Sequence, residues 1–248
     1  MSDSSSNIVA IIPARFGSTR FPGKPLAIVG GVPMIERVYR RVRDSNIVNR
    51  VVVATDDIRI KTAVESFGGE VVMTNVECEN GTIRCYDALK QLNPIPSAII
   101  NVQGDEPFVH PEQLISLVEL IKKPDSCIST LAHPMTASDP GREDPNKVKV
   151  VIDEESKALY FSRSPIPHNE GTWLQHVGLY GFTFSALELV ARLSPSILEK
   201  RENLEQLRWL SAGLKIDVGI TERRTPSVDT PEDLAKIEEL LGSGWTVD

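Results

Sequence analysis

The chain has 248 residues, of which 41% are hydrophobic and 25% are charged, so it can bury a sizeable core and is not predominantly disordered. It carries 27 lysine and arginine residues against 34 aspartate and glutamate residues, a formal net charge of −7. An acidic chain is repelled by nucleic acid and by anionic membranes at long range, which excludes general binding of either. Any anionic ligand would need a local cluster of basic side chains.

The cysteines and the start of the chain bear on its compartment. Cys78, Cys85 and Cys127 form no CxxC pair, and an odd number without metal-ligand spacing indicates free thiols in a reducing compartment. Residues 1–7 are polar and lack the basic start of a signal peptide, so we interpret them as a disordered leader. No apolar run has the length of a membrane span. These features predict a cytoplasmic protein without membrane insertion.

Strand and helix patterns alternate in the first half of the chain. Apolar runs predict strands at Ile8–Ala14, Arg50–Thr55, 70–73 and 98–102. Apolar residues at helical spacing predict helices at 33–43, 58–67, 82–92 and Pro111–Ile121. Because this order requires crossover connections, we expect an α/β fold with a mostly parallel, doubly wound sheet.

The pattern changes after about residue 133. Short strands at 147–152 and Ala158–Ser162, joined by a polar turn, predict a β-hairpin. The remaining predicted elements are a strand at 176–184, helices at 186–193 and 204–212, a strand at 215–220 and a helix at 231–241. We therefore predict a single domain over residues 8–248 that contains an inserted β-rich subregion.

The segment RFGSTRFPGKP, residues 15–25, directly follows the first predicted strand. Open α/β sheets bind ligands outside the carboxyl ends of their strands. Glycines here allow close approach of the backbone to a ligand, and Arg15, Arg20 and Lys24 supply positive charge, which suits phosphate. The segment is not a P-loop, because its glycines are too far apart and Pro25 replaces the hydroxyl residue that binds magnesium. The alternative is a surface turn with scattered basic residues.

Two acidic segments are candidate metal ligands. In NVQGDEP, Asp105 follows a buried strand, where a carboxylate is costly without a nearby cation, and it is placed to hold magnesium. In SVDTPEDL, Thr230 and the acids after it form a good helix start, so Asp229 is not needed for the cap and is a candidate second ligand. The alternatives are a polar loop for the first segment and a simple helix start for the second.

Polar residues in the second half predict a further pocket. Arg163 follows the strand ALYFS, and His176 and Tyr180 are four residues apart, so both side chains would project from one face of a strand. With Glu205 and Gln206, early in a helix, they would form a pocket suited to a hydroxylated acid. The alternatives are a histidine satisfied within the fold and an ion pair between Arg163 and Glu205.

Seven segments, in one order between residues 11 and 234, together resemble the 3-deoxy-manno-octulosonate (Kdo) cytidylyltransferase family. They are IIPARFGSTRFPGKPL, VVVATDD, NVQGDEP, ALYFSRSPIP, HVGLYGF, NLEQLR and SVDTPEDL. The resemblance implies a nucleotidyltransferase fold of the glycosyltransferase-A type. It also implies the reaction CTP + Kdo → CMP-Kdo + pyrophosphate, with magnesium, in lipopolysaccharide synthesis by a homodimer.

The resemblance also implies roles for individual residues and regions. The expected catalytic residues are Arg15, Lys24, Asp105 and Asp229, of which the two aspartates bind magnesium. The expected nucleotide-binding residues are Ala14, Arg15, Ser18, Lys24 and Gln103. The expected sugar-binding residues are Arg84, Arg163, His176, Tyr180, Glu205 and Gln206. Residues from 8 to about 133 would then bind the nucleotide, about 134–230 would bind the sugar and dimerise, and 231–248 would form a C-terminal helix and tail.

Two other functions remain open at this point. Ile83 stands where the family usually has an acid, next to Arg84, and this departure concerns the sugar site. The acceptor could therefore be another sugar acid, such as the 8-amino analogue of Kdo or a sialic acid. A catalytically silent sugar-nucleotide-binding protein is the second alternative, although the presence of Arg15, Lys24, Asp105 and Asp229 together argues against it.

Overall fold

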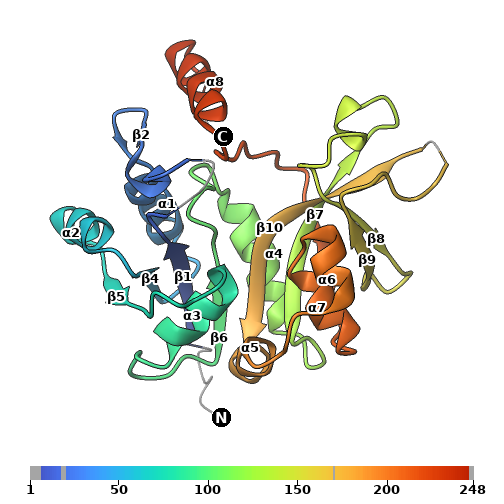
Figure 1. The fold of residues 1–248 in the computed structure, drawn as a ribbon, viewed down its shortest axis with the longest axis horizontal. Helices are drawn as coiled ribbons and strands as arrows, with labels where there is room; N and C mark the ends of the chain where they lie inside the picture. Colours follow the sequence, from blue (N-terminus) through green and yellow to red (C-terminus); the bar gives the residue numbers. More distant parts are fainter. Residues whose placement is uncertain (1–6, 18–20, 170, 246–248) are drawn as a thin grey trace. The chain divides into compact units, whose positions relative to one another are not determined.

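A computed structural model describes residues 7–17, 21–169 and 171–245 of the chain. The chain divides into two compact units. The first unit contains the residues up to Ile115 and again those from Thr225, and the second unit contains Ser116–Arg224. In Figure 1 the first unit therefore includes both the blue-to-green half of the ribbon and the red C-terminal helix.

Four parallel strands form the sheet of the first unit, in the order β6-β1-β4-β5. Their bounds are β1 (Ile8–Ala14), β4 (Arg50–Thr55), β5 (Val71–Met73) and β6 (Ala98–Asn101). All seven residues of β1 are buried, which explains its continuous apolar sequence. Because β1 and β6 are parallel neighbours, the loops that follow them leave the same edge of the sheet.

Helices pack against this sheet. They are α1 (Met34–Asp44), α2 (Ile58–Ser66) and α3 (Gly81–Leu89). Two further helices are α4 (Pro111–Ile121), which crosses the boundary between the units, and α8 (Pro231–Gly242), near the C-terminus. Both α1 and α3 contact β1 and β4, and α2 contacts β4 and β5. A turn of 3-10 helix (Lys24–Leu26) and the short hairpin of β2 (Ile28–Val29) and β3 (Val32–Pro33) precede α1. The carboxylate of Glu238 on α8 accepts a hydrogen bond from the backbone N–H of Gly30 in this hairpin.

The second unit is built around a mostly antiparallel sheet. Its strands are β7 (Ile128–Met135), β8 (Lys149–Ile152), β9 (Ala158–Ser162), β10 (Trp173–Thr183) and β11 (Asp217–Ile220). Strand β10 pairs antiparallel with β7 and β8, β8 and β9 form a hairpin, and β11 runs parallel to β7. The remaining elements are a 3-10 turn (Pro140–Arg142), α5 (Phe184–Ala191), α6 (Ile197–Glu202) and α7 (Gln206–Ser211). Trp209 packs edge-on against Tyr180 and Phe182 in the core of this unit.

The predicted fold class is confirmed, since the first unit has a parallel α/β sheet and the second is rich in β-strands. The sequence patterns did not predict β7, α6 or the small hairpin of β2 and β3. Helix α6 has only six residues and buries none of them, so it carries no apolar periodicity. The strand expected at 176–184 begins earlier and ends at Thr183, because the Thr183 hydroxyl caps α5 by accepting a hydrogen bond from the Ala186 N–H.

Two further findings concern the chain as a whole. Within the described residues, no helix has both the length and the apolar character needed to cross a membrane. All three cysteines are free thiols, with Cys78 and Cys85 buried and Cys127 exposed.

Candidate active site

A cavity of about 270 Å³ in the first unit lies where β1 and β6 end. Its walls come from the loop after β1, the start of α3, the loop after β6 and the segment before α8. The lining residues are Pro13, Ala14, Arg15, Lys24, Pro25, Cys78, Glu79, Asn80, Gly81, Arg84, Gln103, Gly104, Asp105 and Asp229. The structure thus brings together all four residues expected to be catalytic, at the edge of the sheet where the sequence predicts a ligand site.

Lys24 connects the two predicted metal ligands. Its Nζ lies 2.6 Å from Oδ2 of Asp105 and 3.4 Å from Oδ1 of Asp229. The Lys24 side chain is 15% exposed, whereas the side chains of Asp105 and Asp229 are 28% and 40% exposed. One cation therefore neutralises part of the charge of two acids that are more than 120 residues apart in the sequence.

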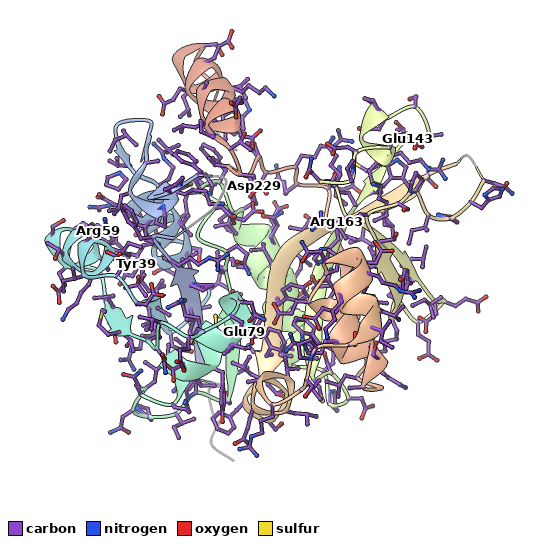
Figure 2. The ribbon with its side chains drawn as sticks, viewed as in Figure 1. Tyr39, Arg59, Glu79, Glu143, Arg163 and Asp229 are labelled. Atoms are coloured by element: carbon purple, nitrogen blue, oxygen red, sulfur yellow. The ribbon has the colours of Figure 1, made fainter. Side chains whose placement is uncertain are left out.

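Backbone and capping interactions fix the position of Asp229, which Figure 2 shows in the segment before α8. The N–H of the preceding residue, Val228, donates a hydrogen bond to the backbone carbonyl of Asp105 at 3.0 Å, which joins the two acidic segments. Thr230 is the N-cap of α8, and its hydroxyl accepts from the N–H of Asp233. The carboxylate of Asp233 accepts in return from the N–H groups of Asp229 and Thr230. The predicted helix start therefore also orients Asp229, although the Asp229 side chain is not part of the cap.

A third carboxyl group, that of Glu106, belongs to the same cluster. The pKa of Glu106 is raised to about 8, first by burial and then by the negative charges of Asp105 and Asp229, while the positive charge of Lys24 opposes the shift. These surroundings therefore favour the protonated form of Glu106. The sequence gives only a weak signal of this state, namely two adjacent acids after a buried strand.

Asp105 and Asp229 fit a divalent cation. Both carboxylates already converge on one positive charge, and carboxylate oxygens are the donors that hard cations such as magnesium prefer. Among the described residues, no group of three or more His, Cys, Asp or Glu side chains is arranged to hold a metal. The two aspartates would therefore supply only part of a coordination shell, and substrate oxygens and water would complete it.

The residues expected to bind nucleotide surround the same cavity, except for Ser18, which lies outside the described residues. Arg15 is exposed at the cavity, and Ala14 is buried as the last residue of β1. Nε2 of Gln103 lies 3.4 Å from Oδ1 of Asn101 at the end of β6. Beside it, Gly104 packs so closely that a Cβ would lie 3.0 Å from the carbonyl oxygen of Pro13. The segment after β6 therefore packs closely against the end of β1, and a side chain at position 104 would not fit between them.

Arg84 also lines this cavity, but it is buried and already paired. Its side chain is 3% exposed, donates to Oγ1 of Thr74 at 2.6 Å and forms an ion pair with Oδ2 of Asp56 at 2.8 Å. Asp56 lies in the segment VVVATDD, but no local pattern in the sequence indicates that it pairs with Arg84. Burial also raises the pKa of the neighbouring Cys78 thiol, although the positive charge of Arg84 opposes this shift.

Arg163, in the second unit, is held by backbone carbonyl groups. Its Nε donates to the carbonyl of Glu202, and its two terminal nitrogens donate to the carbonyls of Pro145 and Asn203. The carboxylate of Glu202 accepts from the N–H of Arg163 and from the hydroxyl of Ser162. A guanidinium has five N–H donors, so two of those on Arg163 make no hydrogen bond within the described part of the chain.

His176 and Tyr180 lie side by side, with ring centroids 5.4 Å apart. Burial lowers the pKa of His176 to about 3, so the ring is neutral. The Thr130 hydroxyl donates to the carbonyl of Leu179, so Nε2–H of His176 donates to Oγ1 of Thr130, 3.0 Å away. The pKa of Tyr180 is raised mainly by burial and also by the negative charge of Glu205. Gln206 is buried at the start of α7.

Comparison with known proteins identifies the family. The family model described as cytidylyltransferase matches residues 9–216. The chain is 46% identical over 248 residues to a 3-deoxy-manno-octulosonate cytidylyltransferase of Parabacteroides distasonis, which covers 95% of this chain and 98% of the relative. It is 39% identical over 244 residues to a mitochondrial 3-deoxy-manno-octulosonate cytidylyltransferase of Arabidopsis thaliana, covering 95% and 83% of the two chains.

A solved structure gives the same result at the level of the fold. The structure of CMP:2-keto-3-deoxy-manno-octonic acid synthetase complexed with CTP matches with a TM-score of 0.90 and 39% identity, covering 97% of this chain and all of that one. Sequence and fold therefore agree over nearly the whole chain, and the resemblance predicted from seven segments is confirmed. The chain belongs to the 3-deoxy-manno-octulosonate cytidylyltransferase family of nucleotidyltransferases.

Proposed function

We propose that this protein transfers CMP from CTP to Kdo, giving CMP-Kdo and pyrophosphate. The observation that carries the proposal is the convergence of Lys24, Asp105 and Asp229 at the cavity where β1 and β6 end. CTP and Kdo are both anionic, so their meeting requires positive charge at the reacting phosphate. The high identity to relatives named for this reaction supports the choice of substrates. The product would serve lipopolysaccharide synthesis.

Magnesium is the proposed cofactor, with Asp105 and Asp229 as its protein ligands. When bound, it would orient the α-phosphate of CTP, favour deprotonation of the attacking hydroxyl and neutralise the leaving pyrophosphate. Lys24 lies beside the same two carboxylates, and its ammonium would bind the phosphates of CTP. Arg15, at the other end of the loop, would hold the triphosphate as well.

Nucleotide recognition is assigned to the walls of the same cavity. Ala14, Ser18 and Gln103 are proposed to contact the cytosine and ribose, with Arg15 and Lys24 on the phosphates. Support for this assignment comes from Pro13, Ala14 and Arg15, which line the cavity at the end of β1, where backbone groups would read the edge of a pyrimidine. We expect CTP to be preferred to ATP and GTP for this reason.

The sugar acid is assigned to Arg84 and to the polar group of the second unit. Arg163 still has two N–H groups for a carboxylate, and a planar guanidinium can hold both oxygens at once. His176, Tyr180, Glu205 and Gln206 would bind the sugar hydroxyls. Two observations support this assignment. The rings of His176 and Tyr180 are adjacent, and the negative charge of Glu205 raises the pKa of Tyr180.

Location and assembly complete the proposal. We propose a cytoplasmic protein, supported by three cysteines that form no disulfide. We also propose a homodimer, which follows from the family resemblance and which sedimentation of the purified protein would test.

A substrate panel tests the proposed function. Pyrophosphate release is measured with magnesium and CTP, ATP or GTP, each with Kdo, 8-amino-Kdo or a sialic acid, and the product is identified by mass. We expect CMP-Kdo from CTP and Kdo at the highest kcat/KM. Equal use of ATP would contradict the cytidylyltransferase assignment. Faster turnover of another acid would replace Kdo as acceptor, and CTP binding without any product would indicate a silent binding protein.

A further inference from the structure

Phe16 and Arg59 stack against each other beside the loop that follows β1. The guanidinium carbon of Arg59 lies 3.3 Å from the centroid of the Phe16 ring, which is a close cation–π contact. Phe16 belongs to the loop, whereas Arg59 is the second residue of α2. Figure 2 shows Arg59 on this helix. The stack therefore joins the loop to a helix that packs against β4 and β5.

Arg59 is exposed, but its orientation is fixed by Asp57. The carboxylate of Asp57 accepts from Nε of Arg59 at 2.9 Å and from a terminal nitrogen at 2.6 Å. It also accepts from the backbone N–H of Arg59, because Asp57 is the N-cap of α2. The hydrogen bonds from the Arg59 side chain lower the pKa of Asp57. A charged, two-point contact thus holds the guanidinium plane over the ring.

Phe16 in turn closes the loop on itself. Its carbonyl oxygen accepts a hydrogen bond from the N–H of Gly23 at 2.9 Å. Gly23 has a φ of 73°, in the left-handed region, and a Cβ there would lie 3.1 Å from the Phe16 ring. Arg15 precedes Phe16 and Lys24 follows Gly23, so this single contact holds both cationic ends of the loop.

We propose that Phe16 and Arg59 are positioning residues for the triphosphate of the nucleotide. This inference rests on the proposed function, since it concerns how Arg15 and Lys24 are presented to CTP. Within the described part of the chain, neither Phe16 nor Arg59 lines the cavity, so they act through the loop ends. Without the stack, the loop samples more conformations, and part of the binding energy of CTP is used to order it.

A double-mutant cycle tests the inference. The variants are Arg59→Met, Phe16→Leu and their combination, with Phe16→Tyr as the conservative variant that keeps a π face. Lys61→Met, on the same helix, is the control for loss of one positive charge. For each protein, KM for CTP and for Kdo, kcat, the Kd of CTP by calorimetry and the melting temperature are measured.

We expect each single variant to raise KM and Kd for CTP by about two- to fivefold, as for a cation–π contact at an exposed site, with KM for Kdo unchanged. The double variant should be no weaker than the weaker single variant, because both remove one contact. Phe16→Tyr and Lys61→Met should bind CTP like the wild type.

Three results would overturn the inference. They are an unchanged affinity for CTP with only a lower melting temperature, multiplicative effects in the double variant, and an equal loss in Lys61→Met. Failure of the proposed function is seen separately, in a wild-type protein that makes no CMP-Kdo. The calorimetric Kd for CTP tests the positioning role in that case too.

Discussion

The two groups of polar residues assigned to the substrates differ in how the fold holds them. In the first unit, Lys24 forms ion pairs with the two carboxylates that are the proposed ligands of a divalent cation. Arg15 is exposed at the same cavity. In the second unit, Arg163 is bonded to three backbone carbonyls, and His176 is bonded to Thr130. Lys24 in the first group is therefore held by ion pairs that a bound cation could replace. Arg163 and His176 in the second group are held by hydrogen bonds that also stabilise the fold of their unit.

Because of this difference, substitutions in the two groups should affect activity and stability to different extents. Partly exposed ion pairs contribute little to folding, so changing Lys24 or Asp105 should affect chemistry far more than stability. A side chain that satisfies buried backbone groups contributes to both, since its loss leaves those groups unpaired. Substitutions in the two units should therefore differ in their effects on activity and on stability.

The largest effect is expected for Asp105→Asn or Asp229→Asn, which remove a proposed magnesium ligand. Turnover should fall about 100-fold or more, as it does when a charge-stabilising group is lost, while the melting temperature changes by only a few degrees. Pyrophosphate release at several magnesium concentrations, with thermal melting, measures both quantities. Glu239→Gln, an exposed carboxylate on α8, is the control. Near wild-type turnover of either variant at limiting magnesium would disprove that ligand.

Arg163→Lys should lower both stability and use of the acceptor. A lysine cannot reach all three carbonyl groups, so unfolding in urea should show a loss of about 1–2 kcal/mol. KM for Kdo should rise while the affinity for CTP stays the same. An unchanged stability would remove the contrast between the units, and an unchanged KM for Kdo would make Arg163 a structural residue only.

His176 should make the second unit sensitive to acid. Its pKa is about 3 in the folded protein and near 6.5 in the unfolded chain, so the unfolded chain binds more protons below pH 6.5. The stability from neutral His176 is complete above that pH and is lost as the pH falls. Between pH 6.5 and 5 the loss should be about 1 kcal/mol, which is less than the full pKa difference would give, because His176 is only half-buried. In His176→Gln the pH slope of unfolding should be smaller, and an equal slope would contradict the assignment.

The smallest effect is expected for Thr230→Ala, which removes the N-cap of α8. Stability should fall by about 0.5–1 kcal/mol, as for other lost caps. Because the cap also orients Asp229, the magnesium concentration at half-maximal rate should rise a few-fold. Thr230→Ser, which keeps the hydroxyl, should restore both values. A stability loss without any change in magnesium dependence would limit the cap to a role in the helix.

Much of the first unit could be predicted from its sequence. The bounds of β1, β4 and α4 match the predicted ranges to the residue, because these elements have continuous apolar runs or a proline start. Strand β7 was missed because it contains buried polar residues whose partners are distant in the sequence. Thr130 bonds to Leu179, and His133 bonds to the carbonyl of Thr221, which no local pattern reveals.

The candidate site shows the same limit. The rule that ligands bind beyond strand ends places Arg15, Lys24 and Asp105 together, and the resemblance adds Asp229. The pairing of nearby side chains could not be predicted, since the Arg84–Asp56 ion pair and the Phe16–Arg59 stack depend on packing between separate elements. Sequence patterns thus indicate which segments meet, and tertiary packing decides which atoms pair.

The most direct test of the central claim is the single-turnover rate of CMP-Kdo formation by Lys24→Met at saturating CTP, Kdo and magnesium. If Lys24 serves the phosphates of CTP, the rate should fall about 100-fold, because its charge stabilises the pyrophosphate that develops in the transition state. The protein should still fold, since the ammonium makes only partly exposed ion pairs. A rate near that of the wild type, with the change confined to KM for Kdo, would contradict the account.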